Sequence, residues 1–223
     1  MRLTQTNDRN FRRYTCVSAY HTLGGANHSQ SITPMPNASP DSVAKITLET
    51  SLDVLRKQKA LGERALTQLD EQQLFEIIDP EANSIAAIVK HLHGNMRSRW
   101  SDFLTTDGEK PDRDRDSEFV ISEGDCTRDV VMRWWNAGWA YVFNALESLE
   151  PHDLDASVMI RGQKMTVIAA ILRQVDHYAQ HIGQIVLLAK HFKGSSWQSL
   201  SIPKGKSAEF EAEFRKKLAA KGG

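Results

Sequence analysis

Two histidines four residues apart, His177 and His181, stand in the stretch DHYAQHIGQI. If this stretch is helical, both imidazole rings leave the same helix face, one turn apart. A third histidine, His91, lies in a second stretch with helical periodicity, SIAAIVKHLHGNMRSRW. Three neutral imidazoles from two helices could hold one divalent cation and leave a coordination position for water or substrate. The histidines therefore predict a metal site, provided that the two helices bring them together.

A histidine pair with this spacing also arises by chance on exposed helices, so the pair alone is weak evidence for a metal. The two rings flank the apolar stripe that runs through Tyr178, Ile182 and Ile185. They are therefore expected at the edge of the buried face, where a ring can reach inward and still meet water. The segment HYAQH lacks the glutamate that follows the first histidine of HExxH zinc proteases, which excludes a metalloprotease of that type.

Each ligating ring should also be held through its second nitrogen. Four polar residues are near enough in sequence to do this, and spacing alone does not choose among Asn95, Asp176, Gln180 and Gln184. His93 is rotated by about 200° from His91 on a helix and is expected to pack elsewhere.

Four long amphipathic segments are expected to position these side chains. Asp41 or Ser42 is the expected N-cap of the first, and Gly194 is the expected stop of the fourth. The second should carry its apolar face as far as Phe103 and Leu104. The segments cover residues 41–69, 83–104, 126–149 and 167–192.

These segments predict an all-α, up-and-down four-helix bundle. Residues 158–160 and 164–166, around Arg161-Gly162-Gln163, are expected to form a small hairpin before the fourth helix. The stretch SAEFEAEFRKKLAAK should form a short C-terminal helix. The predicted organisation is a flexible leader (1–40), the bundle (41–195), and a C-terminal loop with its short helix (196–223). Translation starting at Met35 instead of Met1 stays open.

The composition limits the classes of partner. A chain of 223 residues with 40% apolar residues fits one domain and a tail. Its 28 acidic residues balance 28 lysines and arginines, which gives no electrostatic reason to expect nucleic acid or an anionic membrane surface. No apolar run approaches the roughly 18 residues of a membrane span. The separated cysteines, Cys16 and Cys126, suggest no disulfide framework and fit a cytoplasmic location.

Four arginines near the second segment could bind an anionic group of a substrate: Arg97, Arg99, Arg113 and Arg115. Their favoured role is pairing with the nearby acidic residues Asp102, Asp114, Asp116 and Glu118. The tryptophans are expected in the core or at a dimer contact, with one of them able to line a pocket. These are Trp100, Trp134, Trp135 and Trp139.

The stretch NSIAAIVKHLHGNMRSRWSDFLTTDGEKPDRDRDSEF, followed by a tryptophan-bearing helix and DHYAQHIGQI, resembles the DinB/YfiT-like superfamily of metal-binding four-helix bundles. It looks most like a bacterial branch catalogued as a domain of unknown function, over about residues 43–195. In that superfamily one histidine from the second helix and two from the fourth bind a divalent metal. The resemblance implies that these are His91, His177 and His181. Members include thiol-dependent transferases and a maleylpyruvate isomerase that uses mycothiol, and many are dimers.

The histidine set together with this resemblance implies a metal-dependent thiol S-transferase or hydrolase that acts on a small electrophilic molecule, and the resemblance implies a homodimer. Zinc or nickel is the expected metal and iron a further option, because an all-histidine set does not suit magnesium or calcium. A low-molecular-weight thiol is the implied cosubstrate, and no separate catalytic base is identified. The alternative is a non-catalytic metal-binding or stress-associated interaction module. The neutral charge counts against DNA binding.

Overall fold

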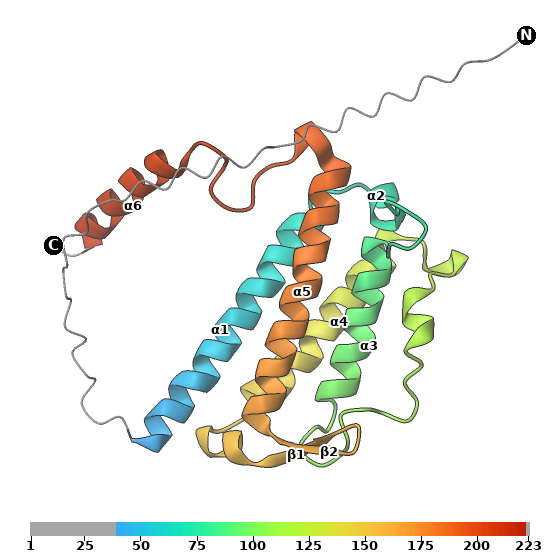
Figure 1. The fold of residues 1–223 in the computed structure, drawn as a ribbon, viewed down its shortest axis with the longest axis vertical. Helices are drawn as coiled ribbons and strands as arrows, with labels where there is room; N and C mark the ends of the chain where they lie inside the picture. Colours follow the sequence, from blue (N-terminus) through green and yellow to red (C-terminus); the bar gives the residue numbers. More distant parts are fainter. Residues whose placement is uncertain (1–38, 222–223) are drawn as a thin grey trace, which may run out of the picture. The chain divides into compact units, whose positions relative to one another are not determined.

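Helices make up most of residues 39–221, the part of the chain that the computed structural model describes. Within this part lie α1 (Pro40–Leu66), α2 (Glu71–Phe75), α3 (Ile85–Trp100), α4 (Arg128–Glu147), α5 (Val167–Lys193) and α6 (Ser207–Lys221) (Figure 1). A two-stranded antiparallel hairpin, β1 (Ser157–Ile160) and β2 (Gln163–Thr166), precedes α5. The predictions of a mostly helical chain, a hairpin and a C-terminal helix are confirmed.

Residues 1–38 and 222–223 lie outside the described part. The predictions about the leader, Cys16 and the choice between Met1 and Met35 fall on residues that the structure does not describe. Among the helices of residues 39–221, none has the length and apolar character needed to cross a bilayer.

Each long helix begins at a hydroxyl side chain that accepts a hydrogen bond from a backbone N–H of the first turn. These caps are Ser39, Ser84, Thr127 and Thr166. The expected cap at Asp41 or Ser42 is wrong, because Pro40 already occupies the first helical position, where its missing N–H costs nothing.

The predicted end of the second long helix is wrong, and the predicted end of the fourth is confirmed. Helix α3 ends at Trp100 and does not continue to Leu104, because Asp102 adopts the left-handed conformation, with φ 47°. Helix α5 ends, as predicted, at Gly194, whose φ of 55° suits a residue without a side chain.

Helices α3 and α4 are consecutive long helices, yet they run in the same direction. Lys90 lies over the ring of Trp134, 5.4 Å from its centroid, and four residues further along α4 Gly138 lies against His93. The connection 101–127 must therefore return along the length of α3 before α4 begins (Figure 1). This order differs from the expected up-and-down order, in which short loops make consecutive helices antiparallel. The connection is long enough to permit the parallel pair.

Helices α3 and α5 run in opposite directions along their contact. Trp100, at the end of α3, donates a hydrogen bond to the hydroxyl of Tyr178 at 2.9 Å, while His91, about two and a half turns earlier, lies beside His181. At the level of His91, α3 lies beside the two successive turns of α5 that carry His177 and His181.

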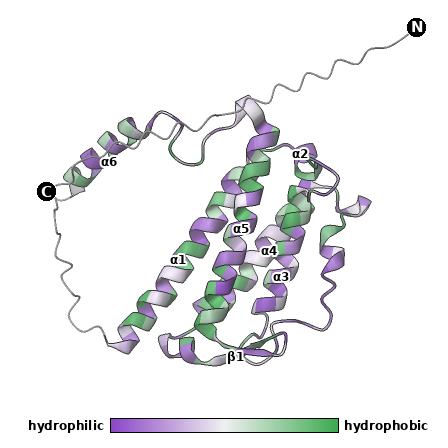
Figure 2. Ribbon diagram, viewed as in Figure 1, coloured by the Kyte–Doolittle hydropathy of each residue, from purple (hydrophilic) through white to green (hydrophobic). Residues whose placement is uncertain are grey.

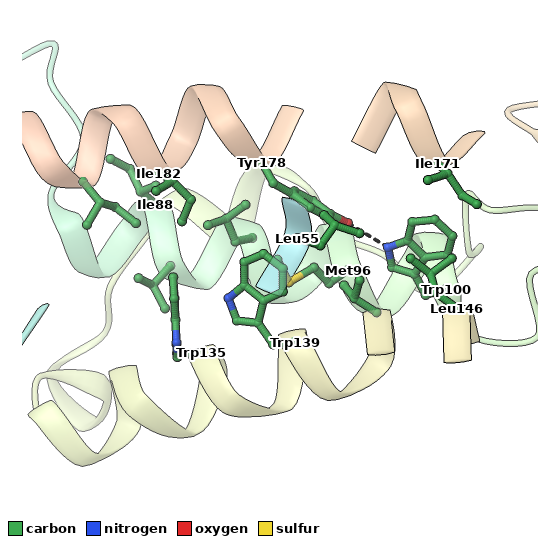
Figure 3. Close-up of a cluster of buried hydrophobic side chains, with 14 of the residues drawn as sticks. Leu55, Ile88, Met96, Trp100, Trp135, Trp139, Leu146, Ile171, Tyr178 and Ile182 are labelled. Atoms are coloured by element: carbon green, nitrogen blue, oxygen red, sulfur yellow. Dashed lines mark hydrogen bonds between the residues drawn. The ribbon is translucent and has the colours of Figure 1, made fainter. Parts of the chain in front are cut away.

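The four long helices share one hydrophobic core. Figure 3 shows Trp135 and Trp139 of α4 directed toward Tyr178 and Ile182 of α5. All four side chains are at most 2% exposed. Figure 2 shows hydrophobic and hydrophilic residues alternating along the helices, as expected for elements with one buried face. The prediction that the tryptophans belong to the core holds for Trp100, Trp135 and Trp139.

The hairpin is tied to the connection 101–127. Its turn, Arg161-Gly162, has both residues at positive φ, which is the geometry of a tight hairpin turn. The Asp107 carboxylate accepts hydrogen bonds from the backbone N–H groups of Arg161 (2.8 Å) and Gly162 (2.7 Å). These hydrogen bonds fix the backbone position of Arg161 and therefore the origin of its side chain.

Two glycines within helices provide a matched test of the packing. A methyl group at Gly62 of α1 would overlap the buried ring of Trp135, whereas at Gly183 of α5 it would meet nothing within 4 Å. We expect Gly183→Ala to raise the free energy of unfolding by about 0.5–1 kcal/mol, because alanine favours helix. Gly62→Ala should lower it by about 1 kcal/mol or more, because overpacking outweighs that gain. Urea unfolding of both variants measures the difference, and equal effects would contradict the packing of α1 against α4.

Candidate metal centre

The structure brings the three predicted histidines together. His91 comes from α3, and His177 and His181 come from successive turns of α5. One ligand atom of each ring lies within 4.8 Å of the others. The ring centroids are 5.5 Å apart for His91 and His177, 4.9 Å for His91 and His181, and 4.6 Å for His177 and His181. The nitrogens of a tetrahedral zinc site lie about 3.4 Å apart, so small ring rotations would close this set around an ion.

The hydrogen bonds of the rings leave nitrogens free for a metal. His91 Nδ1 is 2.8 Å from Glu118 Oε2, and His181 Nδ1 is 2.8 Å from Gln184 Oε1. Both partners are acceptors, so each Nδ1 donates and each Nε2 keeps its lone pair. Nε2 of His177 is buried and has no hydrogen-bond partner among the described residues. These three side chains therefore fit a divalent metal and could hold one.

The protonation states suit the same role. Burial, followed by repulsion from His181 and His91, lowers the pKa of His177 to about 3. Burial also lowers the pKa of His181. Both rings are then neutral at pH 7, which is the form that binds metals.

Glu118 holds the most buried of the three rings. Its carboxylate accepts hydrogen bonds from His91 and, at 2.7 and 2.9 Å, from Nε and Nη2 of Arg113. Burial alone would raise the pKa of Glu118, but the hydrogen bonds from His91 and Arg113 outweigh it, and the pKa is lowered. The carboxylate therefore stays ionised beside the ring. The next residue, Phe119, stacks on His91 with 4.8 Å between ring centroids.

Gly94 makes room for this carboxylate. A side chain at position 94 would overlap the carboxyl group of Glu118, three residues along α3 from His91. The absence of a side chain there lets the connection 101–127 approach the helix. Neither Gly94 nor the contact between Glu118 and His91 follows from the spacing of the histidines.

The candidate ring partners separate clearly in the structure. Gln184, one of the four residues considered, accepts a hydrogen bond from the His181 ring. Asn95 instead accepts a hydrogen bond from the Tyr178 hydroxyl at 3.3 Å, and Asp176 pairs with Gln180 at 2.9 Å. His93 faces Tyr141 of α4 and lies outside the cluster, as predicted. The pairing expected for the arginines is confirmed for Arg113 with Glu118, whereas Arg97 pairs with Asp112 and Arg99 with Glu109.

A cavity of about 310 Å³ opens beside the histidines. His91 and His177 line it together with Asn95, Gln174 and several arginines. A ligand in this cavity would contact His91 and His177, whereas His181 does not line it. Trp100, Trp135 and Trp139 do not line it.

Comparison with known proteins shows the family. Residues 42–206 match a family described as a protein of unknown function, DUF1572, and the chain belongs to it. No curated protein matches the chain.

The Glu118 contact predicts an effect on metal affinity. Glu118→Gln keeps the shape of the side chain but removes the charge that orients and polarises His91. We expect zinc affinity to fall by about 10- to 100-fold, the usual effect of removing such a partner. Competition with a chromophoric chelator measures the affinity. Glu147→Gln, at an exposed glutamate paired with Arg56, is the matched control and should bind zinc like the unaltered protein.

The low pKa of His177 predicts a pH dependence for the metal-free protein. Histidine in the unfolded chain titrates near pH 6.5, so between about pH 6.5 and 3 the unfolded chain binds a proton that the folded protein rejects. The contribution of neutral His177 to the free energy of unfolding is therefore fully present above pH 6.5 and is lost as the pH falls toward 3. Urea unfolding of chelator-treated protein across this range should show a shallower decline for His177→Gln. The same decline in both proteins would show that the ring titrates normally.

Proposed function

We propose that this protein is a four-helix bundle of the DinB type that binds one divalent transition metal through His91, His177 and His181. The single observation that carries the proposal is the convergence of these rings beside an open cavity. The long helices supply them in the pattern of that superfamily, one histidine from the second (α3) and two from the fourth (α5).

Zinc or nickel is the proposed metal, with iron as a further option. Three imidazole nitrogens suit these borderline ions and give no oxygen-rich shell for magnesium or calcium. No further Cys, Asp or Glu joins the three histidines within residues 39–221, which supports a site with a position left for a ligand.

We further propose that the protein is a metal-dependent thiol S-transferase or hydrolase that acts on a small electrophilic molecule. A divalent ion held here would act as a Lewis acid that makes a thiol or a water molecule more nucleophilic. The chain itself supplies the rest: Glu118 fixes the tautomer of His91, Gln184 fixes that of His181, and the cavity walls orient the substrate. A low-molecular-weight thiol, a cytoplasmic location and a homodimer belong to the same proposal.

The alternative is a metal-binding or stress-associated module without turnover. It would be favoured by a cluster sealed by a fourth protein ligand or packed shut by tryptophans. The cavity that His91 and His177 line supports the enzyme instead.

Metal content tests the binding proposal directly. Elemental analysis of protein purified without a histidine tag should find close to one equivalent of a transition metal. His91→Ala, His177→Ala and His181→Ala should each lose it, because two imidazoles hold a divalent ion far less tightly than three. His93→Ala, on the same helix but outside the cluster, is the matched control and should retain it. Unchanged metal content in the three cluster variants would contradict the assignment.

Turnover separates the enzyme from the module. A panel of small electrophiles, each assayed with several biological thiols and with water alone, should show a rate that disappears on metal removal and in His177→Ala. Metal binding without any thiol- or metal-dependent rate across the panel would favour the module.

A further inference from the structure

The cavity beside the histidines is rich in positive charge. Its lining includes five arginines and one acidic residue, contributed by α3, the connection 101–127, the hairpin turn and α5. These residues are Arg99, Arg113, Arg115, Arg161, Arg173 and Asp176. Such a lining does not match the neutral charge of the whole chain, so it marks a local preference for anions.

Two glutamates neutralise part of this charge. Glu109 accepts hydrogen bonds from Arg161 at 2.7 Å and from Arg99 at 2.9 Å, and Glu118 binds Arg113. Burial would raise the pKa of Glu109, but the hydrogen bonds from Arg161 and Arg99 outweigh it and lower the pKa to about 2. Both carboxylates are ionised at neutral pH, so these three arginines are largely satisfied within the protein.

Arg115 and Arg173 remain as free cations at the cavity. Neither has an ion-pair partner among the residues that the structure describes, and both side chains are exposed. The carboxylate of Asp176, on the same wall, accepts a hydrogen bond from Gln180. With Glu109, Glu118 and Asp176 counted against the five arginines, the cavity keeps two positive charges in excess.

Two buried polar atoms of the lining also lack partners. Nε of Arg99 and Oε1 of Gln174 have no hydrogen bond within residues 39–221, although these residues are only 4% and 3% exposed. A buried polar group without a partner is costly and rare. One atom is a donor and the other an acceptor, and neither is accessible in this structure, so a small rotation of each side chain would let a molecule in the cavity with an anionic oxygen and a neighbouring donor satisfy both.

We propose that this cavity binds the oxyanion of a small molecule, a carboxylate or a phosphate, through Arg115 and Arg173, with Gln174 accepting a hydrogen bond from a donor group beside it. The guanidinium group matches both kinds of anion because its N–H groups form a planar fork. The volume, about 310 Å³, lies at the lower end of small-molecule sites. That the molecule is the substrate or the thiol cosubstrate rests on the proposed function, since the anion would then sit beside His91 and His177.

Binding to the metal-free, full-length protein tests the anion site without any turnover. Isothermal titration calorimetry with succinate, inorganic phosphate and the neutral analogue succinamide should show heat for at least one anion and none for succinamide. The tighter of the two anions identifies the chemistry. Binding should weaken with added salt, because the attraction is electrostatic. Absence of binding by both anions would overturn the proposal.

Variants assign the binding to the two free arginines. Arg115→Gln and Arg173→Gln should each weaken anion binding by about tenfold, since each removes a charge-assisted hydrogen bond. Arg133→Gln is the matched control, because Arg133 is an exposed arginine of α4 outside the cavity. Equal binding by the unaltered protein and the double variant Arg115→Gln/Arg173→Gln would contradict the assignment.

A second comparison tests Gln174. Malate differs from succinate by one hydroxyl group, which can donate to Gln174 Oε1. We expect malate to bind about three- to tenfold more tightly than succinate, and Gln174→Leu to abolish this preference. A Gln174→Leu protein that still prefers malate would show that the amide has no such role.

The experiments distinguish a failure of the anion site from a failure of the proposed metal site. If Arg115→Gln/Arg173→Gln retains its metal but the unaltered protein binds no anion, the anion site is wrong and the metal site stands. If the anion binds with the expected variant pattern but the protein holds no metal, the proposed function is wrong and the anion site stands.

Discussion

The buried hydrogen bond between His91 and Glu118 is the interaction on which the rest of the candidate centre depends. It joins α3 to the connection 101–127 and selects the tautomer of the most buried ring. The same carboxylate engages Arg113, so one side chain organises the histidine cluster on one side and the cavity wall on the other. Loss of either partner would leave a buried polar or charged group unsatisfied, which makes this part of the structure intolerant of change.

Chain direction explains how the centre is assembled. The contact of α3 with α5 sets one histidine opposite two, and the parallel contact of α3 with α4 requires a long return segment. That segment delivers Glu109, Arg113 and Glu118 to the site. The helices thus provide the neutral nitrogen atoms, whereas the irregular segments provide most of the charge. The hairpin joins this arrangement through Asp107, which holds the turn that carries Arg161.

The sequence predicts the helices, the hairpin and the identity of the three clustered histidines. Helical periodicity depends on local spacing, and the rings lie beside apolar stripes that must face each other, so both can be read from the chain. The direction of α4 cannot be read in this way, because it depends on how the connection 101–127 crosses the molecule. For the same reason Glu118 is recognisable only as a partner for arginine, although it also binds His91. Arg161, Arg173 and Gln174 reach the cavity from segments whose own spacing carries no sign of a shared wall.

The connection 101–127 contributes only Phe103 to the buried hydrophobic residues of the described core. Its contacts with the centre are the ring of Phe119, which stacks on His91, and the polar side chains of Arg113 and Glu118, and its backbone lies outside the long helices. The exposed residues of such a segment can be exchanged with little loss of folding free energy, whereas buried Glu118 and the core residues of α3 and α5 cannot. Within one scaffold, mutation could therefore alter which molecules are accepted while leaving the nitrogen donors in place. Divergence of selectivity in proteins built on this plan should begin in this segment.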